Sequence, residues 1–277
     1  MDIQLISDLH LEFQDVTLPG GDVLVMAGDI LVASAWRKAA NEGKDTFIAD
    51  RFTRFITEEL SKYRKVVYVA GNHEHYSGRY DETHDLIRQH LPDNCHFLEK
   101  EAVQIDDVWF FGGTLWTDCN KGDPVTMHTI KDGMMDYRSI KFGDSIQVQT
   151  GYGSAYWTNK FTPQFTKSEF HKTVEALKTF LESHPDDKVV VVTHHAPTEL
   201  SIDPYYKNEY HMNGGYHSRL GNFIIDHPNI KYWFHGHMHS HSEYQMGESW
   251  VVTNPRGYAG WEETAEIFDP TFRKITL

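Results

Sequence analysis

Short apolar runs that end abruptly in polar residues recur along the chain. Five are rich in Val, Ile and Leu or aromatic side chains: residues 3–6, 23–27, 66–70, 189–192 and 232–234. Runs of this length and composition are typical of strands buried on both faces of a sheet. Because open α/β sheets bind ligands at the carboxyl ends of their strands, the polar residues after each run are the first candidates for function.

Helical spacing predicts two long helices between these strands. Apolar residues recur every three or four positions in 45–63 and again in 167–183,. Thr166 followed by Glu169 resembles a capping box, which would start the second helix,.

Shorter signals complete the expected α/β organisation. A third helix is expected at 218–226, ended by the His227-Pro228 pair,. After residue 241 the pattern changes to strands and turns. Without repeats or linker-like stretches, we expect a single domain over 1–277, built from mixed sheets and flanking helices.

One long segment lacks clear periodicity. Residues 117–165 are rich in Gly, Asp, Lys, Thr and Tyr. A stretch this long without clear structure inside a domain is usually functional or inserted. We therefore predict a cap over the functional site.

Charge and cysteine content narrow the class of protein. The formal net charge is −14, which counts against high-affinity binding of duplex nucleic acid,. A nucleotide or a strand end is still compatible, since a bound metal can outweigh a global deficit of positive charge. Two cysteines without a CxxC pattern suit a reducing cytosol,. No signal peptide or membrane-length apolar run is visible, so we expect a cytoplasmic location and no membrane partner.

The residues after the five strands have the chemistry of metal ligands. They offer imidazole, carboxylate and amide groups: Asp8, His10, Asp29, Asn72, His194, His237 and His239. Two divalent cations about 3.5–4 Å apart need one bridging carboxylate and mostly neutral donors around it. Asp29 suits the bridging position because its segment supplies only one ligand.

Each segment alone has an ordinary explanation. Asp8-x-His10 and Gly28-Asp29 are common in turns, and Gly71-Asn72-His73-Glu74 fits a turn into a helix,. The His-rich tract at 235–241 could bind metal adventitiously on a surface. The coincidence of suitable ligands at the ends of five apolar runs favours a metal site.

The ordered motifs DxH, GD, GNHE, THH and GHMH resemble the calcineurin-like metallophosphoesterase superfamily. The resemblance spans residues 8–239, and residues 251–258 resemble the C-terminal strand and turn of bacterial members. It implies a four-layer α-β-β-α sandwich of two mixed β-sheets flanked by helices, with the metals at one edge.

The resemblance also implies a role for each ligand. Asp8, His10, Asp29 and His239 would hold the first metal. Asp29, Asn72, His194 and His237 would hold the second. His73 matches the histidine that contacts the phosphate and protonates the leaving group, and Glu74, where Asp is common, could orient it.

The implied reaction is direct hydrolysis of a phosphoester. Two Lewis-acidic ions lower the pKa of a bridging water toward about 7, which gives a hydroxide for in-line attack on phosphorus. The sequence shows no evident pair of a nucleophile and an activating base. We therefore do not expect a phospho-enzyme intermediate. The mixed donors accept Mn²⁺, Fe or Zn²⁺, so the identity of the metals stays open.

Substrate contacts are less defined. His195 could contact the substrate or support a metal ligand, or it could be an ordinary surface residue. Arg138 and Arg256 could each bind phosphate. An ion pair with Asp136 is an equally good explanation for Arg138, and a structural role in a rigid turn is one for Arg256. The loop at 213–216 could admit substrate.

Three hypotheses for the function follow. A small phosphoester such as a nucleotide is favoured by the acidic surface, and catalysis would use His73 and Asp29. A phosphoprotein or a nucleic-acid end at the same site is the alternative. A non-catalytic scaffold is disfavoured by the complete ligand set. The sequence does not indicate an oligomeric state.

Overall fold

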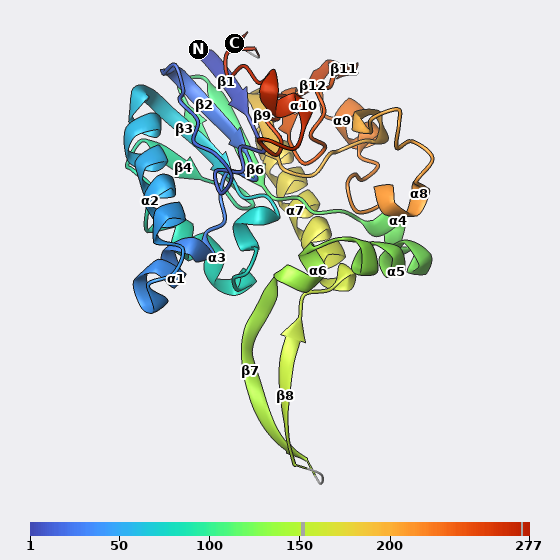
Figure 1. The fold of residues 1–277 in the computed structure, drawn as a ribbon. Helices are drawn as coiled ribbons and strands as arrows, with labels where there is room; N and C mark the ends of the chain where they lie inside the picture. The colour runs from blue at the N-terminus through green and yellow to red at the C-terminus, as the bar shows by residue number, and fades with distance from the viewer. Residues whose placement is uncertain (151–152, 273) are drawn as a thin grey trace.

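Two mixed β-sheets pack face to face, and helices cover their outer faces (Figure 1). The computed structural model describes residues 1–150, 153–272 and 274–277, and the side chains of these residues outside 144–159 and 274. The α/β sandwich predicted from the sequence is therefore confirmed, with both sheets mixed and helices on either side.

The first sheet has the strand order β13-β1-β2-β3-β4. Its strands are β1 (Asp2–Ile6), β2 (Gly21–Ala27), β3 (Tyr63–Val69), β4 (Cys95–Phe97) and β13 (Lys274–Thr276). β1 to β4 are parallel, and β13 pairs antiparallel with β1. Because β1, β2 and β3 run in the same direction, their carboxyl ends meet at one edge.

The second sheet has the order β11-β12-β10-β9-β6-β5. Its strands are β5 (Glu101–Ile105), β6 (Val108–Gly113), β9 (Lys188–Thr193), β10 (Ile230–His235), β11 (Glu243–Met246) and β12 (Ser249–Thr253). β6, β9, β10 and β12 are parallel, with Val192 opposite Phe234. The outer strands β5 and β11 are antiparallel to their neighbours.

Strand alternation divides the apolar side chains between three layers of core. In β2, Val23 and Val25 pack between the two sheets, whereas Leu24 and Met26 pack beneath the helices on the other face,. Those helices are α1 (Ser34–Glu42), α2 (Thr46–Arg54) and α3 (Tyr80–Arg88). On the far side, α7 (Pro163–Ser183) and α9 (Gly221–Ile225) cover the second sheet.

The five strands expected from apolar runs are present as β1, β2, β3, β9 and β10. The first expected helix is also present, and α2 continues through a π-helical turn (Phe55–Glu59) and a 3-10 turn (Leu60–Lys62). The third expected helix, at 218–226, is shorter in the structure, where α9 covers only Gly221–Ile225.

The expected start of the second helix is wrong. α7 begins at Pro163, and its N-cap is Thr162, whose hydroxyl accepts a hydrogen bond from the Phe165 amide. A threonine cap followed by proline at the first helical position outcompetes the capping box expected at Thr166.

The segment 117–165 contains regular structure that the sequence pattern did not reveal. It forms α4 (Cys119–Gly122), α5 (Pro124–Gly133) and α6 (Asp136–Ser139), then the hairpin strands β7 (Lys141–Thr150) and β8 (Gly153–Lys160). The hairpin extends away from the sandwich (Figure 1). The short helices α8 (Tyr210–Asn213) and α10 (Glu263–Glu266) complete the fold. Among the described residues, no helix combines the length and apolarity needed to cross a membrane.

Candidate metal centre

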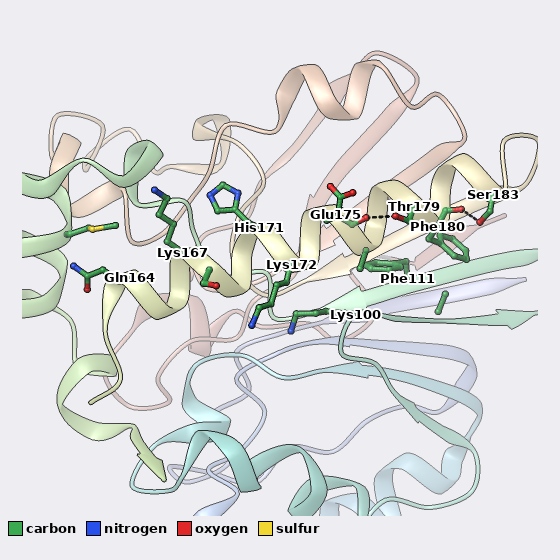
Figure 2. A pocket seen from close by; sticks show the side chains of 14 residues that line it. Lys100, Phe111, Gln164, Lys167, His171, Lys172, Glu175, Thr179, Phe180 and Ser183 are labelled. Carbon is green, nitrogen blue, oxygen red and sulfur yellow. Dashed lines mark hydrogen bonds between the residues drawn. The ribbon is translucent and has the colours of Figure 1, made fainter. Parts of the chain in front are cut away.

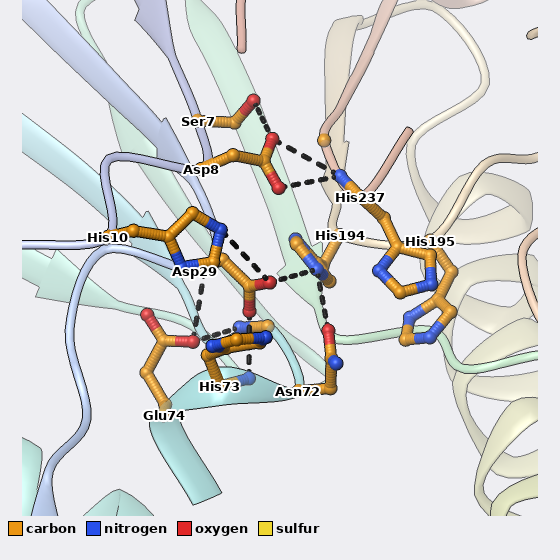
Figure 3. Close-up of polar contacts among 12 residues, drawn as sticks. Ser7, Asp8, His10, Asp29, Asn72, His73, Glu74, His194, His195 and His237 are labelled. Carbon is orange, nitrogen blue, oxygen red and sulfur yellow. Dashed lines mark hydrogen bonds and ion pairs between the residues drawn. The ribbon is translucent and has the colours of Figure 1, made fainter. Parts of the chain in front are cut away.

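Five segments that follow parallel strands converge at one edge of the sandwich. The loops after β1, β2 and β3 come from one sheet, and those after β9 and β10 come from the other (Figure 3). They bring together the seven predicted ligands: Asp8, His10, Asp29, Asn72, His194, His237 and His239. All are buried except His239, which is partly exposed.

The first predicted set of ligands forms one compact group. Asp8, His10, Asp29 and His239 each offer a ligand atom, and these atoms lie within 4.8 Å of one another. His10 Nε2 is 3.2 Å from His239 Nε2, which in turn is 3.5 Å from Asp8 Oδ1. This group could hold one cation.

A second group shares Asp29 with the first. It contains Asp29, His194 and His237. His194 Nε2 lies 3.2 Å from Asp29 Oδ2 and 3.0 Å from Asn72 Oδ1, so the amide oxygen joins the same group. Asp29 is thus common to both groups, and its bridging of two ions, like the assignment of ions to the other residues, stays a prediction.

Most of the predicted ligands lie on strained backbone, a feature they share with nine other non-glycine residues of the described chain. Five of the seven have positive φ: Asp8 (52°), His10 (45°), Asp29 (55°), His237 (70°) and His239 (48°). Non-glycine residues adopt this left-handed region at a cost, and they concentrate at functional sites.

Two further features fit cation binding. His237 Nε2 is buried and has no hydrogen-bond partner among the described residues, as expected of a nitrogen reserved for a metal,. A Cβ at Gly71 would lie 2.2 Å from Asp29 Oδ1, and one at Gly236 would lie 2.6 Å from Asp8 Oδ2. Glycine is therefore required where the backbone passes directly beside the carboxylates.

The electrostatics of the group favour ionised carboxylates. Burial alone would raise the pKa of Asp29, but His194 and His73 hold this pKa well below its usual range. Burial is likewise outweighed at Asp8, whose pKa is lowered by His239. His237 has its pKa lowered by burial and by His195, so its imidazole is neutral. At His194 and His239 the carboxylates of Asp29 and Asp8 outweigh burial and raise the pKa values to about 9 and about 10. A bound metal would displace the proton from these two imidazoles, because ionised carboxylates and neutral imidazoles are the forms that bind metal.

The Asn72 amide is held by two residues for which the sequence predicted no part in the metal site. Asn72 Nδ2 donates to Asp136 Oδ1 (2.8 Å) and to the Tyr76 hydroxyl (3.1 Å), and that hydroxyl donates to Asp136 (2.6 Å). These bonds turn the amide oxygen toward His194. Asp136 lies in α6, so the helical part of the predicted cap supports the site.

His73 lies beside the first group of ligands. Its backbone amide donates to Asp29 Oδ1 (2.8 Å). Its Nδ1 is 3.4 Å from Glu12 Oε1, and its Nε2 is 3.2 Å from the Tyr258 hydroxyl. One ring nitrogen therefore faces a carboxylate, while the other faces a polar group that a substrate could replace.

The expected pairing of Glu74 with His73 is wrong. The buried Glu74 carboxylate accepts hydrogen bonds from the amides of Asp29, Ile30 and Gly71 and from the Tyr68 hydroxyl. It joins the loops after β2 and β3 and has no capacity left for an imidazole. Glu12 takes the position beside His73, and its signal in the sequence was its spacing of two residues from His10.

The three predicted substrate contacts have different surroundings. His195 is buried against the ring of His237 (4.2 Å between centroids), so the surface role is excluded. The Arg256 guanidinium donates to the carbonyls of Leu9, Gln14 and Asp15 and to the Gln14 side chain. These bonds favour the structural role of Arg256.

Arg138 and the loop at 213–216 lie on the cap side. Arg138 is exposed, and its guanidinium contacts the Asp132 carbonyl rather than Asp136. A phosphate contact by Arg138 stays a prediction. Tyr216 of the loop lies 4.8 Å from the His237 ring, which places this loop beside the second group of ligands.

A separate groove of about 1130 Å³ runs along α7 (Figure 2). Phe111 and Phe180 form part of its apolar lining, and Lys100, Lys167 and Lys172 line its polar part. None of its lining residues belongs to the two ligand groups.

The chain belongs to the calcineurin-like phosphoesterase family, whose model matches residues 1–241. An uncharacterized protein of Acanthamoeba polyphaga mimivirus is 25% identical over 281 residues, covering 93% of this chain and 91% of the relative. A UPF0046 protein of Caenorhabditis elegans is 32% identical over 119 residues, covering 39% of this chain and 37% of the relative.

Solved structures agree with the fold. The crystal structure of phosphopantetheinyl hydrolase (PptH) from Mycobacterium tuberculosis superposes with a TM-score of 0.63 at 15% identity, covering 99% of this chain and 95% of that one. This likeness bears on the architecture alone. The chain is thus a calcineurin-like metallophosphoesterase with a His/Asp cluster suited to metal.

Proposed function

We propose that this protein hydrolyses phosphate mono- or diesters with two divalent cations. The cations would be held by seven residues that follow strands of both sheets: Asp8, His10, Asp29, Asn72, His194, His237 and His239. The observation that carries this proposal is the position of Asp29, which belongs to both groups of ligands. When bound, the cations would supply Lewis acidity and an activated water. The donor set accepts Mn²⁺, Fe or Zn²⁺.

His73 would act as the general acid. Its Nδ1 faces Glu12, and its Nε2 is directed away from that carboxylate toward the Tyr258 hydroxyl. Burial would lower the pKa of His73, but Asp29 and Glu12 outweigh burial and raise it. A protonated imidazole in this position can donate its Nε2 proton to the leaving oxygen.

The rest of the chain holds these groups in place. Asp136 and Tyr76 orient the Asn72 amide, and Glu74 fixes the loops that carry Asp29 and Asn72. Buried ligands within a hydrogen-bonded frame need little rearrangement to bind a cation. The cysteines Cys95 and Cys119 are free, which fits the cytoplasmic location that we propose,.

The proposal is tested by hydrolysis of aryl phosphates with the Mn²⁺-loaded protein. We expect His73→Asn to lower kcat by about 10²–10⁴-fold while metal content is retained, with a greater loss for poor leaving groups. The exposed variant His128→Asn is the matched control. An equal loss across leaving groups would refute the general-acid role, and an inactive metal-loaded protein would refute the proposed reaction.

A further inference from the structure

The turn after β12 lies against the candidate metal centre. The Arg256 amide donates to the Ser7 carbonyl (3.0 Å). One residue further on, the Gly257 amide donates to the Asp8 carbonyl (2.9 Å). The family model matches residues 1–241 and ends before this turn. A segment outside the matched region is therefore fastened to the loop that carries the first group of ligands.

Glu262 is the residue that this turn brings to the centre. Its Oε2 lies 2.7 Å from His239 Nδ1, and the same oxygen accepts a hydrogen bond from the Tyr258 amide (2.9 Å). The backbone of Gly257, where φ is 80°, passes so close that a Cβ there would collide with this oxygen. Glycine is therefore required at this position, and the Glu262 carboxylate is held in a defined place.

The hydrogen bond to Glu262 fixes the tautomer of His239. A carboxylate that is ionised at neutral pH can only accept a hydrogen bond, so the Nδ1 atom of His239 carries a proton. The other nitrogen, Nε2, faces the first group of ligands, 3.2 Å from His10 Nε2 and 3.5 Å from Asp8 Oδ1. Nε2 is therefore the atom that would bind a cation, and the negative charge behind the ring raises its basicity.

The two groups of ligands differ in what supports their histidines. Both histidines of the first group have Nδ1 beside a carboxylate, since His10 Nδ1 lies 3.2 Å from Glu12 Oε1. In the second group, His194 Nδ1 donates to the Ala27 carbonyl (2.9 Å), which carries no net charge. Removal of the charge of Glu262 should therefore act on the first group alone.

We propose that Glu262 is a positioning residue that acts through His239 and sets the affinity of the first group of ligands for its cation. This inference rests on the metal centre of the proposed function. The charge of the carboxylate is the property that matters, because it strengthens the imidazole as a donor. In Glu262→Gln the amide oxygen can still accept from His239 and from the Tyr258 amide, so this variant removes the charge and keeps the hydrogen bonds of the turn.

Metal binding measures the effect of Glu262 without turnover. In a titration of the metal-free protein with Mn²⁺, we expect Glu262→Gln to weaken one of two ions about 10–100-fold and to leave the other unchanged. Glu263→Gln is the matched control, because Glu263 is exposed, adjacent in the sequence and of the same charge. This control should bind both ions as the wild type does.

The outcomes separate the inference from the proposed function. If the wild type binds two ions and Glu262→Gln binds both equally well, the inference is overturned and the proposed function stands. A wild type that binds no Mn²⁺ would refute the proposed function, and the inference with it. Circular dichroism should show that metal-free Glu262→Gln is folded. An unfolded variant would assign Glu262 to the fold and overturn the positioning role.

Variants with one remaining site identify the ion that Glu262 affects. His237→Ala removes a ligand of the second group, whose Nε2 has no hydrogen-bond partner to lose among the described residues. His10→Ala removes a ligand of the first group, and each variant should retain one ion. Added to His237→Ala, Glu262→Gln should weaken the remaining ion about 10–100-fold. Added to His10→Ala, it should leave the Kd of the remaining ion unchanged. Equal weakening in both backgrounds would contradict an action through His239.

Discussion

Glu12 Oε1 lies 3.4 Å from Nδ1 of His73, and the same oxygen lies 3.2 Å from Nδ1 of His10. One carboxylate therefore orients both a predicted metal ligand and the proposed general acid. Its place is in the loop after β1, four residues from Asp8. Outer-shell carboxylates of this kind fix the orientation of an imidazole and raise its basicity.

Replacing Glu12 by Gln should lower kcat about 10–100-fold, with a smaller change in KM. The pKa of His73 is raised by Asp29 and Glu12 against the effect of burial. A general acid acts only while protonated, so activity is lost as the pH rises through this pKa. Loss of the Glu12 charge should move the alkaline limb of the pH profile to lower pH. An unchanged limb with reduced kcat would assign Glu12 a structural role instead.

Asp136 should control metal affinity without binding metal. In Asp136→Asn the new amide could donate to the Asn72 side chain and turn its oxygen away from His194. We expect the affinity of one of two Mn²⁺ ions to fall about 10–100-fold, measured by metal titration. Tyr76→Phe removes only one of the two bonds to Asn72 and should have a smaller effect. If both variants bind both Mn²⁺ ions with the affinity of the wild type, Asn72 needs no support from Asp136 or Tyr76.

Glu169 at the start of α7 should make stability depend on pH. Its carboxylate lies 3.0 Å from Lys100 Nζ and 2.7 Å from Lys172 Nζ. Burial would raise the pKa of Glu169, but the two lysines outweigh burial and lower it. A lowered folded-state pKa gives stability that is present above the unfolded value of 4.5 and is lost as the pH falls through the folded value,.

Glu169→Gln should therefore lower the free energy of unfolding by about 1–3 kcal/mol at pH 7, and the difference should shrink below pH 4. Thermal unfolding across this pH range measures the effect. Glu182→Gln is the control, since Glu182 is exposed and lies 3.8 Å from Lys178. A constant difference between wild type and Glu169→Gln at all pH values would exclude the ion pairs as its cause.

The sequence revealed the strands and their polar ends because both are local signals. Val23 and Val25 sit in a short β-branched run that is typical of a buried strand, and Asp29 follows where the run ends. The start of α7 was missed because Thr162 and Pro163 lie at the edge of a segment with weak periodicity. Local competition between two caps decided that boundary.

The supporting residues were missed for a different reason. Asp136 is 64 residues from Asn72, and Tyr258 is 185 residues from His73. Such contacts depend on how loops of both sheets meet in space, which spacing along the chain does not encode. Glu74 shows the converse, since its adjacency to His73 suggested a pairing that the backbone amides of Asp29, Ile30 and Gly71 prevent.

Metal stoichiometry tests the central claim most directly. After removal of bound metal and reconstitution with Mn²⁺, elemental analysis should find two ions per chain in the wild type. Asp29→Asn should lose both, since Asp29 belongs to both groups of ligands, whereas the exposed Asp186→Asn should retain both. A wild-type protein that binds no metal, or an Asp29→Asn variant that keeps two ions, would contradict a dinuclear centre bridged by Asp29.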